Sequence, residues 1–183
     1  MSSATQANAG PTTWKIDPAH TSVEFSVKHM MIATVKGRFA DLSGTVVVDE
    51  ANPTGGRADI TINAASIDTR EAQRDTHLKS AEFFDVEKFS TITFRSTRLD
   101  GDGQAFKMIG DLTIHGVTRP ITLDVTHEGR GKDPWGGERV GYAATGKIKR
   151  SDYGLTWNAA LETGGFLVGD DVKISLDIEL VKQ

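Results

Sequence analysis

Apolar and polar residues alternate along most of this chain. Between residues 22 and 28, apolar Val23, Phe25 and Val27 are interleaved with polar side chains, and the segment Val172–Leu180 repeats the pattern near the C-terminus. A period of two places successive side chains on opposite faces of a β-strand. The pattern therefore predicts strands that each have one apolar face and one polar face.

Segments of this kind recur along the chain, mostly with short, turn-forming connections. About eight can be distinguished: Thr21–His29, Gly37–Val48, Ala58–Asn63, Thr91–Ser96, Phe106–Ile114, Ile121–Val125, Val140–Ile148 and Val172–Val181. A phase change near Gly44 predicts a β-bulge in the second of them. Because almost nothing else in the sequence can cover the apolar faces, the sheet is expected to close on itself. We predict an all-β fold, an eight-stranded antiparallel up-and-down barrel.

One stretch departs from the strand pattern. Residues 69–85 are highly charged, contain no glycine or proline, and end in Phe83, Phe84 and Asp85. This composition favours helix. We predict one or two short helices here, held against one end of the barrel by the two phenylalanines.

The length of 183 residues suits a single domain with a substantial core. We expect this domain to span residues 14–183 and a disordered polar tail to span residues 1–13. The tail lacks the basic and apolar regions of a secretory signal, which favours a cytoplasmic location. The protein would be periplasmic or secreted if the sequence as given lacks its leader. No apolar run approaches the roughly 20 residues of a transmembrane segment.

The composition argues against several classes of function. The chain has no cysteine, which removes disulfides, thiolate zinc sites and cysteine nucleophiles. Its net charge of −4 is mild and spread out, so we expect no nucleic-acid partner. The five histidines are at least nine residues apart and no Gly-x-Ser-x-Gly elbow is present. We therefore expect no metal site, no catalytic residue and no cofactor.

Arg74, Asp75 and His77 form the densest polar group on the predicted helix. They could serve as an acid–base set. We favour a structural interpretation, in which Arg74 and His77 share one helix face and hydrogen-bond the backbone of the barrel rim.

The in-phase positions of the strands would form a nearly uniform apolar lumen. An eight-stranded barrel either fills its lumen with side chains or holds one small ligand, and the periodicity alone supports both equally. Small residues at four in-phase positions suggest spare room: Ala58, Gly110, Ala144 and Gly146. His29 shares the phase of Phe25 and Val27, so we expect it to be a polar group inside the pocket. The residues expected to line the lumen and bind lipid are Phe25, Val27, His29, Ile60, Ile62, Phe94, Met108, Leu112, Ile114 and Tyr142.

Several segments resemble the YceI-like family of polyisoprenoid-binding, lipocalin-like proteins. They run in order from residue 14 to residue 181 and include Trp14–Phe25, Val27–Met30, Gly37–Phe39, Ile67–Thr69, Arg74–Leu78, Glu82–Asp85, Thr93–Ser96, Gly110–Pro120, Asp152–Leu155 and Val168–Val172. Each piece is short, but their number and order make the resemblance specific.

The resemblance implies a barrel that holds a long-chain isoprenoid or other amphiphilic lipid as its partner, and it favours the open lumen. It implies a non-enzymatic role in lipid storage, transport or stress protection, with Asp75 and His115 as structural anchors. Many family members are periplasmic and members are often dimeric, so a homodimer is one expected state. Two alternatives remain: a barrel enzyme acting on an isoprenoid-like substrate, and a packed-barrel interaction module without ligand.

Overall fold

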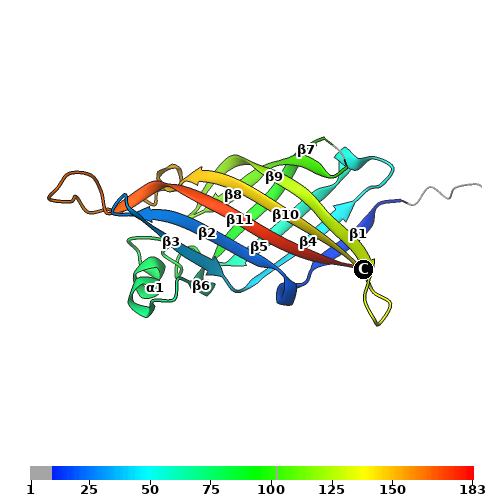
Figure 1. The fold of residues 1–183 in the computed structure, drawn as a ribbon, viewed down its shortest axis with the longest axis horizontal. Helices are drawn as coiled ribbons and strands as arrows, with labels where there is room; N and C mark the ends of the chain where they lie inside the picture. Colours follow the sequence, from blue (N-terminus) through cyan, green and yellow to red (C-terminus); the bar gives the residue numbers. More distant parts are fainter. Residues whose placement is uncertain (1–9, 102) are drawn as a thin grey trace, which may run out of the picture.

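The computed structural model describes residues 10–101 and 103–183. Within them the chain forms eleven strands and one α-helix (Figure 1). The strands are β1 (Thr12–Ile16), β2 (Ser22–His29), β3 (Ala33–Phe39), β4 (Leu42–Val48), β5 (Arg57–Asn63), β6 (Ile67–Asp68), β7 (Thr91–Asp100), β8 (Ala105–Ile114), β9 (Val117–Lys132), β10 (Glu138–Lys149) and β11 (Val168–Lys182). The α-helix is α1 (Ala72–Lys79), and short 3-10 turns span Pro18–His20, Pro53–Gly55, Ala64–Ser66 and Arg150–Tyr153. Over the described residues, no helix has the length and apolarity to cross a membrane.

The strands pair antiparallel and the sheet closes into a barrel. The hydrogen-bonded order runs β1-β4-β5-β7-β8-β9-β10-β11, and β11 returns to β1 where Leu180 pairs with Ile16. This ring of eight strands confirms the predicted up-and-down barrel. The remaining strands β2, β3 and β6 extend the same walls, because β2 also pairs with β11, β3 with β2, and β6 with β3.

A turn at Pro18–His20 separates β1 from β2, which both pair with β11. Pro18 has no backbone N–H to donate to a ladder and its ring fixes φ, so a strand rarely continues through it. The Asp17 side chain caps the turn by accepting a hydrogen bond from the Ala19 backbone N–H at 3.0 Å. The N-terminal part of the chain therefore forms two strands, β1 and β2, where a longer single strand could otherwise run.

The two ends of the barrel differ. The helix end carries α1, the β2–β3 turn and the long β10–β11 connection, all at the left of Figure 1. The terminal end carries the start of β1 and the C-terminus, where the Gln183 N–H donates to the Thr13 carbonyl oxygen at 2.9 Å. It also carries the β4–β5, β7–β8 and β9–β10 loops.

The predicted strand Gly37–Val48 is wrong as one element, because it is divided between β3 and β4, and two further details depart from the prediction. The first strand begins at Thr12, inside the stretch expected to be tail, whereas residues 1–9 of that stretch lie outside the described residues. The bulge predicted at Gly44 is wrong, because β4 and β5 stay in regular register from Leu42 opposite Ile62 to Gly44 opposite Ile60 and beyond. Gly44 occupies an inward position of β4. Because it has no side chain, the alternation of apolar and polar residues looks as if it changed phase, although the strand register does not change.

The predicted helical stretch contains a single helix. Helix α1 begins after Glu71, whose carboxylate accepts hydrogen bonds from the backbone N–H groups of Gln73 and Arg74. This carboxylate cap satisfies donors that have no partner within the helix. A short loop then leads from α1 to Phe83 and Phe84.

Candidate functional site: the barrel lumen

Two adjoining cavities occupy the lumen. The cavity at the helix end has a volume of about 180 Å³, and the cavity at the terminal end has a volume of about 330 Å³. We call them the helix-end chamber and the terminal-end chamber. Both are lined by the same five residues at the waist where they meet: Ile60, Phe94, Leu123, Leu176 and Ile178.

Residues after α1 cover the helix-end chamber. Phe83 and Phe84 line it together with Leu78 of the helix, and Phe83 is buried. Phe84 meets Phe39 of β3 edge-on, with ring centroids 5.9 Å apart. The predicted attachment of the two phenylalanines to a barrel end is therefore confirmed.

Helix α1 is fastened to the barrel through Thr69, which directly follows β6. Arg74 donates from Nε to Thr69 Oγ1 and from Nη2 to the Thr69 carbonyl oxygen, both at 2.8 Å. The Asp75 carboxylate accepts the Thr69 backbone N–H at 2.9 Å. Arg74 thus binds rim backbone as predicted, whereas His77 bonds the Glu82 carboxylate instead and packs edge-on against Trp157 at 4.8 Å.

His115 also holds two parts of the helix end together. It stands with Gly116 in the tight β8–β9 turn, both at positive φ, and its Nδ1 lies 3.3 Å from the Tyr153 carbonyl oxygen. Its ring packs against Phe89 at 4.7 Å. These contacts fit the anchoring role implied by the family resemblance.

Arg150 is a buried charge beside the helix-end chamber. Its side chain is 7% exposed, and burial lowers the pKa of the guanidinium. Its nitrogens donate to backbone carbonyls of the β10–β11 connection and the start of β11: Leu155, Trp157, Val168 and Gly169, at 2.8–3.3 Å. The arginine therefore shapes the long connection at this end, and its donors are largely taken by the protein itself.

The terminal-end chamber is larger and has polar groups at its rim. Ala58 and Ala144 line it, and their short side chains leave the space open. Ionisable and hydroxyl-bearing residues also line it: Asp49, Glu50, Arg57, His127 and Tyr142. Its volume falls within the range typical of small-molecule pockets.

Most of the residues predicted for the lumen do line a chamber. Phe25, Val27, Ile62, Leu112 and Ile114 line the helix-end chamber. Met108 and Tyr142 line the terminal-end chamber, and Ile60 and Phe94 line both. The prediction for His29 is not supported, because His29 lines neither chamber. It is the last residue of β2, at the rim, where the strand passes into an exposed turn.

Two of the four small residues do not provide space. A Cβ atom at Gly110 would lie 2.5 Å from the Phe94 ring, so that ring already fills the site. A Cβ atom at Gly146 would lie 2.8 Å from Leu123 Cδ2. The spare room comes from Ala58 and Ala144 instead.

Several lining residues were missed by the sequence analysis. Leu42 was missed because the glycine at position 44 hid the inward phase of β4. Leu155 belongs to an irregular connection that has no periodicity. Arg150 could have been found, because it continues the inward phase of Ala144, Gly146 and Ile148 at the end of β10.

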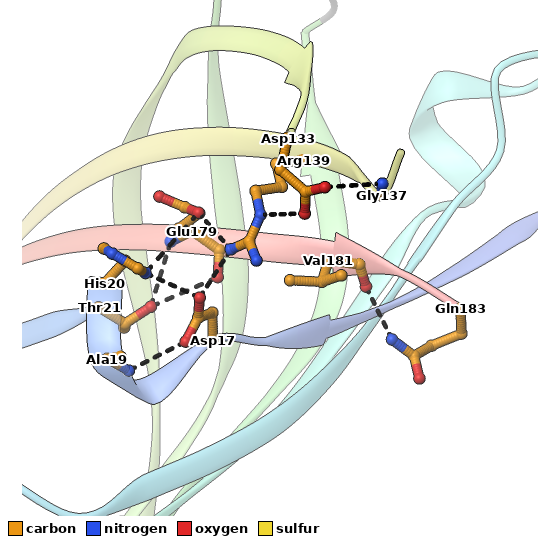
Figure 2. Close-up of polar contacts among 10 residues, drawn as sticks. All are labelled: Asp17, Ala19, His20, Thr21, Asp133, Gly137, Arg139, Glu179, Val181 and Gln183. Atoms are coloured by element: carbon orange, nitrogen blue, oxygen red, sulfur yellow. Dashed lines mark hydrogen bonds and ion pairs between the residues drawn. The ribbon is translucent and has the colours of Figure 1, made fainter. Parts of the chain in front are cut away.

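A second polar cluster lies outside the two chambers, near the terminal end (Figure 2). Arg139 Nη1 donates to Asp17 Oδ2 at 2.7 Å and to Glu179 Oε1 at 2.6 Å, and Nε donates to Asp133 Oδ2 at 2.9 Å. His20 lies 2.8 Å from Asp17, and these hydrogen bonds from His20 and Arg139 lower the pKa of Asp17 to about 2. Asp17, His20 and Glu179 have the atoms of a metal site within 4.8 Å of one another. Since Arg139 already hydrogen-bonds the carboxylates of both Asp17 and Glu179, we interpret the cluster as a structural ion-pair network.

The closed barrel and its enclosed apolar lumen define a lipocalin-like β-barrel of the ligand-holding kind. The chain belongs to the YceI-like family: the model of the YceI-like domain matches residues 14–180. A UPF0312 protein of Serratia proteamaculans is 40% identical over 171 residues, covering 92% of this chain and 86% of that protein. Protein YceI of Salmonella newport is 39% identical over 181 residues, covering 98% and 92%. These relatives are bacterial.

Solved structures share the fold. BcnA of Burkholderia cenocepacia superposes with a TM-score of 0.78 at 25% identity, covering 90% of this chain and 98% of that protein. A polyisoprenoid binding domain from Saccharophagus degradans superposes with a TM-score of 0.67 at 16% identity, covering 94% and 99%. At 16% identity, the similarity to this Saccharophagus domain shows a shared fold.

Proposed function

We propose that this protein binds a long-chain amphiphilic lipid in its lumen, of polyprenyl, prenyl quinone or fatty-acyl type, and stores or carries it unchanged. The pair of adjoining apolar chambers is the observation that carries the proposal. The polyisoprenoid-binding domain of Saccharophagus degradans, with the same fold, supports it at the level of the family.

The energetics favour such a ligand. Each buried methylene contributes roughly 0.8 kcal/mol, so a chain of about twenty carbons gives on the order of 16 kcal/mol before the costs of ordering are subtracted. That is sufficient for a lipid to remain bound through purification. Apolar walls discriminate weakly between chains of similar width, so polar contacts at one end should set the head-group preference.

Binding is favoured over catalysis by where the polar lining groups lie. In the described residues, the ionisable groups of the terminal-end chamber gather at its rim loops and at one wall. In the helix-end chamber the Arg150 guanidinium is engaged by backbone carbonyls. His127 and Tyr142 share that wall, but among the described residues no carboxylate or second base hydrogen-bonds either of them to form a catalytic relay.

The test is solvent extraction of freshly purified protein, followed by mass spectrometry of the extract. We expect a stoichiometric prenyl or fatty species. The Ala144→Leu variant should carry roughly tenfold less, because its larger side chain occupies the terminal-end chamber. The matched control is Ala143→Leu, one residue earlier on β10, since Ala143 pairs with Asp177 and lines neither chamber.

A blank extract from the wild type, repeated after incubation with a prenyl quinone and with a fatty amide, would refute lipid binding. The hypothesis of a packed-barrel interaction module without ligand would then be favoured. Equal lipid loads in Ala144→Leu and the wild type would place the ligand outside the terminal-end chamber.

A further inference from the structure

Two polar side chains face the terminal-end chamber from neighbouring strands. Tyr142 of β10 pairs directly with His127 of β9, and their rings lie 5.4 Å apart in an edge-on arrangement. Both line the chamber. Both residues are half-buried, and no group within residues 10–101 and 103–183 hydrogen-bonds the Tyr142 hydroxyl or the His127 ring nitrogens. Two polar groups thus face a mostly apolar cavity.

The strand register explains how they meet. Along β9, the inward positions are Leu123, Val125 and then His127, so an imidazole stands where the alternation calls for an apolar residue. The β9–β10 register shifts between Gly141 and Tyr142, and this irregularity sets the tyrosine opposite the histidine. Without the shift, residue 142 would face residue 128.

An aromatic wall continues from this pair. The Phe106 ring of β8 packs edge-on to Tyr142, with centroids 6.2 Å apart. All three rings therefore line one side of the terminal-end chamber, across β8, β9 and β10. The wall can hold a flat or small polar group against three rings that carry one hydroxyl and one imidazole.

Both polar groups are half-buried, so a ligand that covers them must offer hydrogen bonds of its own, since leaving them unpaired away from water costs free energy. Burial raises the pKa of Tyr142, so its hydroxyl stays protonated and can donate. A neutral imidazole has one donor and one acceptor. The pair thus offers complementary hydrogen bonds to a hydroxyl, carbonyl or amide group.

The charges around this chamber do not favour an anion. Asp49, Glu50 and Arg57 line it, and Glu50 is paired with Arg130 at 2.6 Å, so no group of convergent cations is present among the described lining residues. At the opposite end, the donors of Arg150 are directed to backbone carbonyls. Hydrogen-bonding capacity for a ligand is therefore concentrated at the terminal end.

We propose that His127 and Tyr142 form a head-group site for an uncharged, hydrogen-bonding lipid head, with the chain running past Phe94 into the helix-end chamber. The proposal rests on the proposed function and adds to it the orientation of the ligand and the class of its head group. An alcohol, carbonyl or amide head fits the site, and a carboxylate or phosphate does not.

Three probes with the same chain length and different heads test this: oleyl alcohol, oleate and 1-octadecene. Each displaces a fluorescent apolar dye from delipidated protein at pH 8. We expect wild type to bind oleyl alcohol at least about fivefold more tightly than 1-octadecene, and oleate less tightly than the alcohol, because an ionised head is costly to bury. Tyr142→Phe should weaken alcohol binding roughly two- to tenfold, the range for one net hydrogen bond. His127→Phe should have a similar effect, and octadecene should bind all variants alike.

Tyr153→Phe is the matched control. The Tyr153 hydroxyl is buried and has no hydrogen-bond partner among the described residues, yet Tyr153 lines neither chamber. Its removal should leave all three affinities unchanged. Equal losses of alcohol binding in Tyr153→Phe and Tyr142→Phe would overturn the head-group site.

The remaining outcomes separate this inference from the proposed function. If none of the probes binds, the proposed function itself fails. If the alcohol and octadecene bind equally and Tyr142→Phe changes nothing, lipid binding stands and the head-group site is wrong. Tighter binding of oleate than of the alcohol would refute the uncharged class of head.

Tryptophan fluorescence tests the orientation of the bound lipid separately. Trp157 packs 5.3 Å from Phe83, which lines the helix-end chamber. Bromine quenches tryptophan fluorescence at short range, so 18-bromo-octadecan-1-ol should quench the protein, and Trp157→Phe should remove most of that quenching. Undiminished quenching in this variant would show that the chain end does not reach the helix end.

Discussion

Gly110 shows at the residue scale how one absent side chain shapes the lumen. A Cβ atom there would lie 2.5 Å from the Phe94 ring and 2.6 Å from the Arg95 carbonyl oxygen. The backbone oxygen cannot rotate away, so Gly110→Ala should lower the free energy of unfolding by about 1–3 kcal/mol. Urea denaturation measures this. Gly131→Ala is the control, since nothing lies within 4 Å of its Cβ position, and similar losses in the two variants would contradict the steric account.

The same residue marks the limit of prediction from the sequence. Periodicity identifies which side chains face inward, and nine of the ten predicted lumen residues line a chamber. Periodicity does not show whether an inward glycine leaves a void or receives a neighbour's ring. It also cannot reveal that Tyr142 and His127 are opposite each other, because that depends on a register shift between two strands.

At the scale of elements, the β2–β3 connection is built from unexpected residues. Met30 and Met31 adopt φ values of 51° and 64°, and the Ile32 N–H donates to the His29 carbonyl oxygen at 3.1 Å. Positive φ at two consecutive central positions is the requirement of type I′ turns, which favour Asn-Gly there. Methionine has neither the freedom of glycine nor a short polar side chain that bonds locally.

Replacing the pair by Met30→Asn and Met31→Gly should therefore raise the free energy of unfolding by about 1–2 kcal/mol. Met31 is 68% exposed, so little packing is lost. Thermal and urea unfolding of the double variant measure the gain. Ile32→Asn controls for the removal of an exposed apolar side chain, because Ile32 is 81% exposed and has an ordinary φ. A double variant less stable than wild type would mean that the Met31 contact with Gly165 outweighs the backbone strain.

The elements themselves were largely predictable, and their irregular connections were not. The charged stretch at residues 69–85 predicts helix α1, but not that Arg74 and Asp75 both bind Thr69. Such contacts depend on the three-dimensional placement of β6. The connection over residues 150–167 has no pattern, so the carbonyls that surround Arg150 could not be anticipated.

At the scale of the whole molecule, Arg139 joins segments that are distant in sequence. Its guanidinium binds Asp17 at the β1–β2 corner, Asp133 in the β9–β10 loop and Glu179 on β11 (Figure 2). The side chains of Asp17 and Asp133 are mostly shielded from solvent. The network therefore fastens the strands that close the barrel at its terminal end, and it is expected to respond to acid.

Asp17 sets the direction of that response. Its pKa is about 2 in the folded protein and roughly 3.9 in an unfolded chain. A lowered pKa contributes stability above the unfolded value, and this contribution is lost as the pH falls through the folded value. Asp17→Asn should therefore be less stable than wild type at pH 7, and the difference should shrink between about pH 4 and pH 2. Urea unfolding of both proteins at pH 7, 4 and 3 tests this, with Asp59→Asn as the control because its exposed carboxylate faces Arg95 at 3.5 Å. A difference that stays constant down to pH 3 would mean that Asp17 acts through packing or turn geometry, and that its charge does not hold the barrel closed.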